Sequence, residues 1–326
     1  MIKYWKMCFT EETMKKLISI VSSAFNEQDN IEELCTQVKQ ICETIQDKYD
    51  YEQIIVDNGS TDNTTQKLRE LAAKDKHIKV IINTRNFGAV RSPYYGILQA
   101  NGDIVILIAA DLQEPPSMII DFINKWEQGY KVVLGQKTSS KESKVMYLIR
   151  TFYYKLLNLF NDSGTKLPEH CTGFGLYDKE VLTKLKSLNE PYPYLRGLVC
   201  ELGYNLTCIQ FCQNKRERGT TKNNFYSLYD MAMLAFTNYS KVPLRIATMC
   251  GFCLSVLSFC LAIFYLIFKL LFWYHLPTGI APILISVFFF FSIQLFFIGV
   301  LGEYLNTILT QIQNRPLVIE KERINF

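Results

Sequence analysis

The stretch Gln53-Ile54-Ile55-Val56-Asp57-Asn58-Gly59-Ser60-Thr61-Asp62 joins an apolar run to an abrupt polar turn. The run is apolar on both faces, which is typical of a parallel strand covered by helices on both sides of a sheet. Similar β-branched runs alternate with helical patterns, and they are Leu17–Ser22, Val80–Asn83, Ile104–Ile108 and Val132–Leu134. This order predicts an α/β fold with a doubly wound, mostly parallel sheet.

Polar clusters follow three of the predicted strands. They are Phe25-Asn26-Glu27, Asp57-Asn58-Gly59-Ser60 and Asp111-Leu112-Gln113. Ligands of such sheets bind beyond the carboxyl ends of the strands, so the clusters predict a binding site. Residues 22–30 contain no glycine and no Walker A sequence occurs, which excludes the dinucleotide fingerprint and the P-loop.

Two of these clusters allow a structural as well as a functional interpretation. Ser60, Thr61 or Asp62 caps the next helix, but capping leaves Asp57 free to bind a base or ribose. Glu27 could simply complement a helix dipole.

The stretch Asp111-Leu112-Gln113-Glu114-Pro115-Pro116 follows an apolar strand directly. The Asp111 carboxylate and the Gln113 amide oxygen are hard ligands that could hold Mg²⁺ or Mn²⁺ together with a diphosphate. A capping aspartate before a proline-initiated helix would account for one of these residues alone.

The C-terminal part is apolar, and Lys269 is the one formal charge from Ile246 to Leu301. Ile246–Leu270 and Ile280–Leu301 are each long enough to span a bilayer, so we expect two transmembrane helices. Basic residues flank this block and are absent from the hairpin between the spans, which predicts a cytoplasmic soluble domain and C-terminus. The flanking residues are Lys241, Arg245, Arg315, Lys321 and Arg323.

Two features precede the first span. Residues 223–245 carry apolar side chains at helical spacing and predict an amphipathic juxtamembrane helix. Arg216, Arg218 and Lys222 suit an anionic lipid head group, with a plain positive-inside flank as the alternative.

The net charge of +4 and the lack of a basic arm give no indication of nucleic-acid binding. We therefore divide the chain into an extension (1–13), a soluble domain (14–222), the juxtamembrane helix, the two spans and a cytoplasmic tail (302–326).

These segments together resemble the family 2 glycosyltransferases of the GT-A fold, and among them the polyprenyl-phosphate glycosyltransferases such as dolichyl-phosphate mannose synthase and the bactoprenol glucosyltransferases. The order and spacing of the motifs carry the resemblance, which covers nearly the whole chain. The matching segments are residues 23–27, 56–62, 85–88, 101–103, 109–116, 173–174, 195–198 and 216–222.

The resemblance implies transfer of one sugar from a UDP- or GDP-sugar to a polyprenyl phosphate with inversion, by a multi-pass protein of the bacterial inner (plasma) membrane. It also implies a divalent metal, a possible homo-oligomer and a role in cell-surface glycan assembly. It assigns the nucleotide-sugar to Ala24, Phe25, Glu27, Asp57, Asn58, Asn86, Ala110, Asp111 and Gln113. It assigns the metal to Asp111 and Gln113, catalysis to Asp111, Lys137 and Arg218, and the lipid phosphate to Arg196, Arg216, Arg218 and Lys222.

The chain departs from the family pattern at three positions. Ala109 replaces the first aspartate of the Asp-x-Asp motif, Asn58 replaces a usual aspartate, and Thr172-Gly173 stands where many relatives have an acidic residue. Activity is still expected, because a phosphate monoester is mostly dianionic near pH 7 and needs no general base. The alternatives are a processive polysaccharide synthase, although Glu217 replaces the tryptophan of its Gln-x-x-Arg-Trp segment, and a non-catalytic lipid-carrier binding or scaffold protein.

Overall fold

The computed structural model describes residues 15–139, 167–213, 242–271 and 280–326, with a few residues between these ranges: 151, 154–155, 158–159, 233–234, 237 and 240. The predicted extension and most of the predicted juxtamembrane helix lie outside these residues, as do Arg216, Arg218 and Lys222.

Within the described residues, eight strands form one mixed sheet in the order β7-β5-β6-β4-β1-β2-β3-β8. The strands are β1 (Lys16–Ala24), β2 (Tyr49–Asp57), β3 (Ile78–Asn83), β4 (Ile104–Leu107), β5 (Val132–Ser139), β6 (Cys171–Asp178), β7 (Leu206–Cys212) and β8 (Glu320–Ile324). Strands β3, β2, β1 and β4 are parallel neighbours, and β7 is parallel to β5. Strand β6 is antiparallel to β4 and β5, and β8 is antiparallel to β3.

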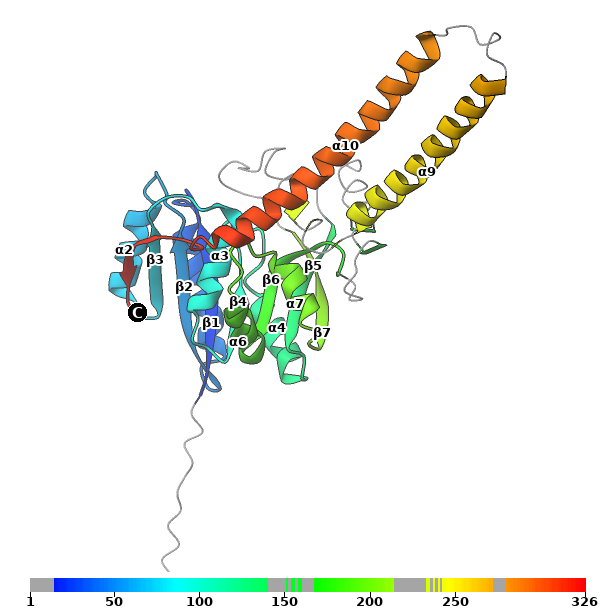
Figure 1. Ribbon diagram of the computed structural model, residues 1–326. Helices are drawn as coiled ribbons and strands as arrows, with labels where there is room; N and C mark the ends of the chain where they lie inside the picture. The colour runs from blue at the N-terminus through cyan, green and yellow to red at the C-terminus, as the bar shows by residue number, and fades with distance from the viewer. Residues whose placement is uncertain are drawn as a thin grey trace, which may run out of the picture.

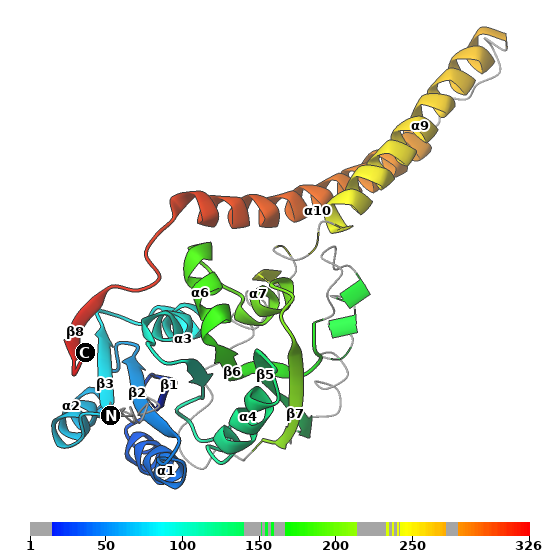
Figure 2. The same cartoon turned by 90° about the horizontal axis from the view of Figure 1, so that it is seen from below.

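Helices cover both faces of the sheet and bury a separate apolar core on each (Figure 2). One face carries α1 (Ile31–Thr44), α2 (Thr64–Lys74) and α4 (Met118–Glu127). The other carries α3 (Gly88–Gln99), α6 (Lys179–Leu188) and α7 (Leu195–Glu201). The central strands are buried on both sides, which accounts for their continuously apolar sequence.

The five strands predicted from apolar runs are confirmed as β1 to β5. The sheet is mostly parallel, as predicted, but it is mixed rather than uniform, because β6 and β8 run against their neighbours. Strand β8 has the sequence EKERI, so no apolar run predicts it. An edge strand does not require an apolar sequence, because backbone pairing with its one neighbour and polar side-chain contacts hold it in place.

Strand β8 brings residues from beyond the apolar helices back to the sheet (Figure 1). The Glu322 carboxylate accepts a hydrogen bond of 2.6 Å from the Arg69 guanidinium on α2. The Glu320 carboxylate accepts one of 2.8 Å from the Tyr95 hydroxyl on α3. The Asn325 amide donates to the carbonyls of Ala72 and Ile78. The region predicted as a tail is therefore partly an integral strand of the sheet.

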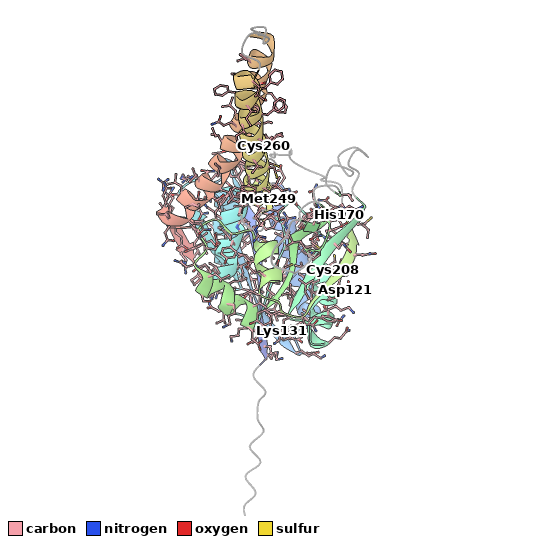
Figure 3. The ribbon with its side chains drawn as sticks, turned by 45° about the vertical axis from the view of Figure 1, so that its right-hand side comes forward. Asp121, Lys131, His170, Cys208, Met249 and Cys260 are labelled. Carbon is pink, nitrogen blue, oxygen red and sulfur yellow. The ribbon has the colours of Figure 1, made fainter. Side chains whose placement is uncertain are left out.

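Two long helices, α9 (Val242–Leu271) and α10 (Ile280–Gln313), project together from one end of the domain (Figure 1). Met249 and Cys260 lie on α9 above the sheet, whereas Asp121 and Lys131 lie in the body of the domain (Figure 3). Many described apolar side chains on both helices are exposed, such as Phe252 at 70% and Phe296 at 67%. Among the described residues, Phe289–Gln313 alone is long and apolar enough to cross a membrane, and Val242–Leu254 is a shorter apolar stretch.

A buried ionic network joins β1, β2 and β3 near the end of the sheet opposite the polar loops. The Glu52 carboxylate accepts hydrogen bonds from Lys79 Nζ at 2.6 Å, from the Asn101 backbone N–H at 3.0 Å and from the Ser19 hydroxyl. Removing the carboxylate leaves the Lys79 charge and these donors without an acceptor.

We expect Glu52→Ala to lower the free energy of unfolding by ~2 kcal/mol, less than the 3–5 kcal/mol typical of fully buried pairs because Lys79 keeps some contact with water. Burial raises the pKa of the Glu52 carboxyl, but its hydrogen bonds outweigh burial and hold the pKa below its ordinary value of 4.5. The stabilisation is therefore present above pH 4.5 and is lost as pH falls through the lowered pKa.

Thermal unfolding of the purified protein as a function of pH measures this effect. Exposed Glu43 on α1 provides the control, since Glu43→Ala removes a carboxylate of the same length from the same domain. Equal melting temperatures for the two variants at neutral pH would contradict the prediction.

Candidate active site

Two loops at the carboxyl ends of β1 and β2 are joined by hydrogen bonds. The Asn26 backbone N–H donates to the Ser60 hydroxyl at 2.9 Å, and the Asn26 side-chain oxygen accepts from the Thr61 N–H at 2.8 Å. The Glu27 N–H donates to the Thr64 hydroxyl at 2.8 Å. Asn26 has a φ of 55°, a conformation that asparagine tolerates better than most residues. The two loops therefore form one rigid margin of the site.

Gly59 lets a third loop, residues 84–88 after β3, approach this margin. Its φ is +72°, and a Cβ at this position would lie 2.5 Å from the Arg85 carbonyl carbon and 2.9 Å from the Asn86 nitrogen. Only glycine satisfies both the conformation and the close approach.

Asn58 fastens the same third loop with both ends of its amide. Its NH₂ donates to Asn86 Oδ1 at 3.0 Å and to the Gly88 carbonyl at 3.1 Å. Its oxygen accepts from the Phe87 N–H at 2.9 Å and from Asn83 Nδ2 at 3.3 Å. The departure from aspartate thus has a structural reason, because a carboxylate could not donate to two oxygens. The predicted donor contacts of Asn58 and Asn86 remain predictions.

We therefore expect Asn58→Asp to loosen the 84–88 loop and to raise the donor KM about tenfold, equal to ~1.4 kcal/mol for two lost hydrogen bonds. Asn124→Asp is a suitable control, since Asn124 is an exposed asparagine on α4. Initial rates at varied donor concentration measure the change, and an unaltered KM would show that the loop does not depend on the Asn58 amide.

The carboxylates of Asp57 and Glu27 accept hydrogen bonds within the protein that the sequence does not predict. Asp57 is fully buried and accepts hydrogen bonds from the Ser60 N–H at 3.0 Å and from the Thr65 hydroxyl. Glu27 is 8% exposed and accepts from the Asn30 side-chain amide at 2.6 Å. Asp62 accepts from the Thr64 N–H at the start of α2, but the N-cap residue is Asn63, one position beyond the three residues predicted for the cap. Asp57 therefore also shapes the turn, a role that the sequence did not assign to it.

The other predicted donor residues lie beside these loops. Ala24 ends β1 and is fully buried, Ala110 is 2% exposed, and Phe25 is partly exposed in the first loop. Small buried residues at 24 and 110 let the backbone approach a ligand closely. The structure thus brings the predicted nucleotide residues to one edge of the sheet.

Asp111 lies in the loop after β4, and one of its carboxylate oxygens accepts from the Gln113 N–H at 3.2 Å. Leu112 between them has a φ of 57°, so the loop makes a tight turn at this point. A polar pocket of about 260 Å³ opens beside Asp111, between α1 and residues 111–117. The Asp111 side chain is partly exposed and accessible to a ligand.

Glu114 is a buried carboxyl group that the sequence did not single out. It accepts hydrogen bonds from the Ala109 N–H at 2.8 Å and from the Thr172 hydroxyl at 3.0 Å, and it thereby joins the Asp111 loop to β6. Burial raises the pKa of Glu114 to about 7, with a smaller contribution from the Asp111 charge. An acidic residue in place of Thr172 would face this carboxyl group, which gives a structural reason for the departure from the family pattern at Thr172.

A chain of side chains links Lys137 to the Asp111 loop. Lys137 Nζ donates to Gln213 Oε1 at 2.9 Å, and Gln213 Nε2 donates to Gln113 Oε1 at 2.8 Å. Lys137 is therefore held near the loop, as its predicted role requires. Gln213 begins the Gln-x-x-Arg segment considered for a processive synthase, but the sequence did not assign it to this site, because its link to Gln113 depends on β5 and β7 being neighbours.

Arg196, predicted to bind the lipid phosphate, lies at the start of α7. Its guanidinium donates to the Tyr154 hydroxyl at 2.8 Å and to the Cys171 carbonyl at 2.6 Å, and it stacks on the Tyr194 ring. These contacts place it close to the beginning of β6. Its partners in the prediction, Arg216, Arg218 and Lys222, lie outside the described residues.

The described residues can supply a metal ion with few ligands of their own. They contain no group of three or more His, Cys, Asp or Glu side chains that could hold an ion. Asp111 offers a partly exposed carboxylate, whereas the Gln113 oxygen already accepts a hydrogen bond from Gln213. Mg²⁺ is commonly bound by one or two carboxylates together with substrate phosphates. Asp111 therefore fits a metal site in which one protein carboxylate binds the ion and the diphosphate of a donor supplies the remaining ligands.

Comparison with known proteins agrees with this architecture. Residues 19–186 match the family described as glycosyl transferase family 2. The chain is 32% identical to an uncharacterized glycosyltransferase of Synechocystis sp. over 93% of this chain and 94% of that protein. It is 31% identical to the SfII prophage-derived bactoprenol glucosyl transferase of Shigella flexneri over 94% of this chain and 97% of that protein.

Among solved structures, glucosyl-3-phosphoglycerate synthase from Mycobacterium tuberculosis is similar with a TM-score of 0.46 and 18% identity, over 68% of this chain and 78% of that chain. The family match spans the strands and loops that form the edge described above. Its agreement with the full-length relatives settles the class of protein. The chain belongs to glycosyl transferase family 2 and is a glycosyltransferase with a mixed α/β sheet of the GT-A type.

Proposed function

We propose that the protein transfers one sugar from a UDP- or GDP-sugar to a polyprenyl phosphate such as undecaprenyl phosphate, for cell-surface glycan assembly or modification. The observation that carries the proposal is the extent of the match to relatives named bactoprenol glucosyl transferase. It covers 94% of this chain and so includes the apolar helices as well as the catalytic domain.

The arrangement of the domain supports a lipid-linked acceptor. Strand β1 begins at the end of the domain furthest from α9 and α10, so its carboxyl end points toward the end from which these helices project (Figure 1). The candidate site therefore faces the helices. We propose that residues 246–270 and 280–301 span the inner (plasma) membrane and that the catalytic domain is cytoplasmic, in keeping with the basic flanks.

The proposed transfer reaction does not require a general base. The acceptor phosphate is mostly dianionic near pH 7, so it can attack the anomeric carbon directly and invert its configuration. The departing nucleoside diphosphate gains negative charge, which the site must stabilise. Lys137, held by Gln213, supplies a positive charge near the Asp111 loop.

Asp111 is proposed to hold a divalent metal, Mg²⁺ or Mn²⁺, whose chemistry when bound is to neutralise diphosphate charge. Glu27, Asp57, Asn58 and Asn86 keep the loops around the nucleotide rigid. Arg196 and the basic segment 216–222 are proposed to receive the lipid phosphate from the membrane side.

A transfer assay in detergent tests the proposal. Purified protein is incubated with Mg²⁺ or Mn²⁺, radiolabelled nucleotide sugars and undecaprenyl phosphate, and the product is extracted into chloroform. A labelled lipid that carries a single sugar with inverted anomeric configuration is expected. A retained configuration would contradict the mechanism, a longer glycan would indicate a processive synthase, and absence of both nucleotide binding and transfer would indicate a non-catalytic protein.

A further inference from the structure

Helix α10 is longer than a membrane span requires. It contains 34 residues, which corresponds to about 51 Å at 1.5 Å per residue, whereas the hydrocarbon core of a bilayer is about 30 Å thick. Residues 280–301 suffice to cross it. Residues 302–313 continue the same helix for three further turns and run along the catalytic domain near α6 and α7 (Figure 2).

These last turns have two distinct faces. The apolar face is exposed, and its members are Leu305 at 63%, Ile308 at 52%, Leu309 at 52% and Ile312 at 75%. They are spaced three or four residues apart, so they lie on one side of the helix. Ile298 at 53% and Leu301 at 45% continue the same stripe into the apolar part of α10.

The opposite face is polar, and it contacts both the segment that precedes α9 and the catalytic domain. The Thr307 hydroxyl donates to the Thr237 hydroxyl at 2.9 Å, and the Tyr304 hydroxyl donates to the Ser240 carbonyl at 2.5 Å. The Gln311 amide donates to the Glu190 carboxylate in the loop after α6. A segment attached to a polar domain along one side cannot be surrounded by lipid, yet its other side carries an apolar stripe continuous with a span.

We propose that residues 302–313 of α10 form an interfacial segment, with their apolar face in the cytoplasmic boundary between lipid head groups and acyl chains and with the catalytic domain suspended from their polar face. The inference rests on the proposed membrane anchoring of α9 and α10. An amphipathic helix in this position buries its apolar side chains to a depth of about 5–10 Å. Exposed Arg315, directly beyond the helix, meets the anionic head groups.

This arrangement fixes how far the active site lies from the membrane surface. The loop between α6 and α7, which contains Glu190, is tied to the interfacial segment and so lies against the membrane. Arg196 at the start of α7 is close behind it in the chain and contacts β6 beside Thr172. A lipid phosphate could thus reach the Asp111 loop without leaving the head-group layer.

Site-specific photocrosslinking in lipid nanodiscs tests the inference with the full chain. The photoreactive residue p-benzoylphenylalanine replaces Leu309 on the apolar face, Thr310 on the polar face or Phe290 in the proposed span. Mass spectrometry then identifies the partner. We expect lipid adducts at 309 and 290 in similar yield, and adducts to the catalytic domain but not to lipid at 310.

The outcomes separate this inference from the proposed anchoring. A lipid adduct at 290 without one at 309 overturns the interfacial segment and leaves the anchoring intact, whereas no lipid adduct at either position overturns the anchoring. Crosslinking of 309 to a second copy of the chain also overturns the inference, because the stripe would then be a subunit contact. If the 309 variant does not fold, position 312 on the same face replaces it.

Discussion

Asp111→Asn is expected to reduce sugar transfer about a thousandfold, equal to ~4 kcal/mol in activation free energy, without unfolding the protein. Asp111 supplies the one carboxylate of the loop after β4 that is open to a ligand, since Glu114 is buried and hydrogen-bonded to Ala109 and Thr172. The neutral amide keeps the size of the side chain and its acceptor for the Gln113 N–H. The loss is therefore expected in kcat more than in stability.

Asp121→Asn is the matched control, because Asp121 is an exposed aspartate on α4 in the body of the domain (Figure 3). It should transfer sugar at the wild-type rate. Both variants should melt at the wild-type temperature. Near-normal transfer by Asp111→Asn would remove Asp111 from the mechanism and leave Lys137 as the group that stabilises the leaving diphosphate.

Gly59→Ala is expected to abolish measurable binding of the nucleotide-sugar and to destabilise the domain. An alanine Cβ would lie 2.5 Å from the Arg85 carbonyl carbon, which is backbone and cannot rotate away. The 84–88 loop must then move, and it breaks its hydrogen bonds to Asn58 as it does so. Isothermal titration with UDP- and GDP-sugars measures the loss.

Gly203 separates this clash from backbone strain. Its φ of +70° matches the +72° of Gly59, but a Cβ there meets nothing within 4 Å. Gly203→Ala should therefore cost only the strain of a left-handed alanine, ~1 kcal/mol, with donor binding unchanged. Similar losses of donor affinity in the two variants would refute the role assigned to the close approach at Gly59.

The first half of the fold is readable from the sequence because its strands are buried on both faces. Continuous apolar runs such as Gln53–Asp57 arise only where helices cover both sides of a strand, so position and parallel pairing follow together. The loops after such strands must share one edge, which is why the polar clusters around Asp57 and Asp111 could be placed together in advance, whereas the roles of single donor residues are what the family resemblance implies.

The remainder depends on contacts that no local pattern records. The sequence does not single out Glu114, yet burial beside Thr172 makes it a link between the Asp111 loop and β6. Gln213 reaches Gln113 across the sheet from one hundred residues away in the chain. Asn58 looks like a weakened aspartate until its amide is seen to donate to two oxygens at once.

Strand β8 has a consequence for the order in which the protein is made. Residues 320–324 follow both long helices in the chain, so the ribosome completes β1 to β7 and delivers α9 and α10 before β8 exists. Until then, β3 presents an unpaired edge, which is a template for aggregation. Premature termination within α10 would leave that edge open permanently. A soluble version cut before α9 would need residues 314–326 rejoined to it to complete the sheet.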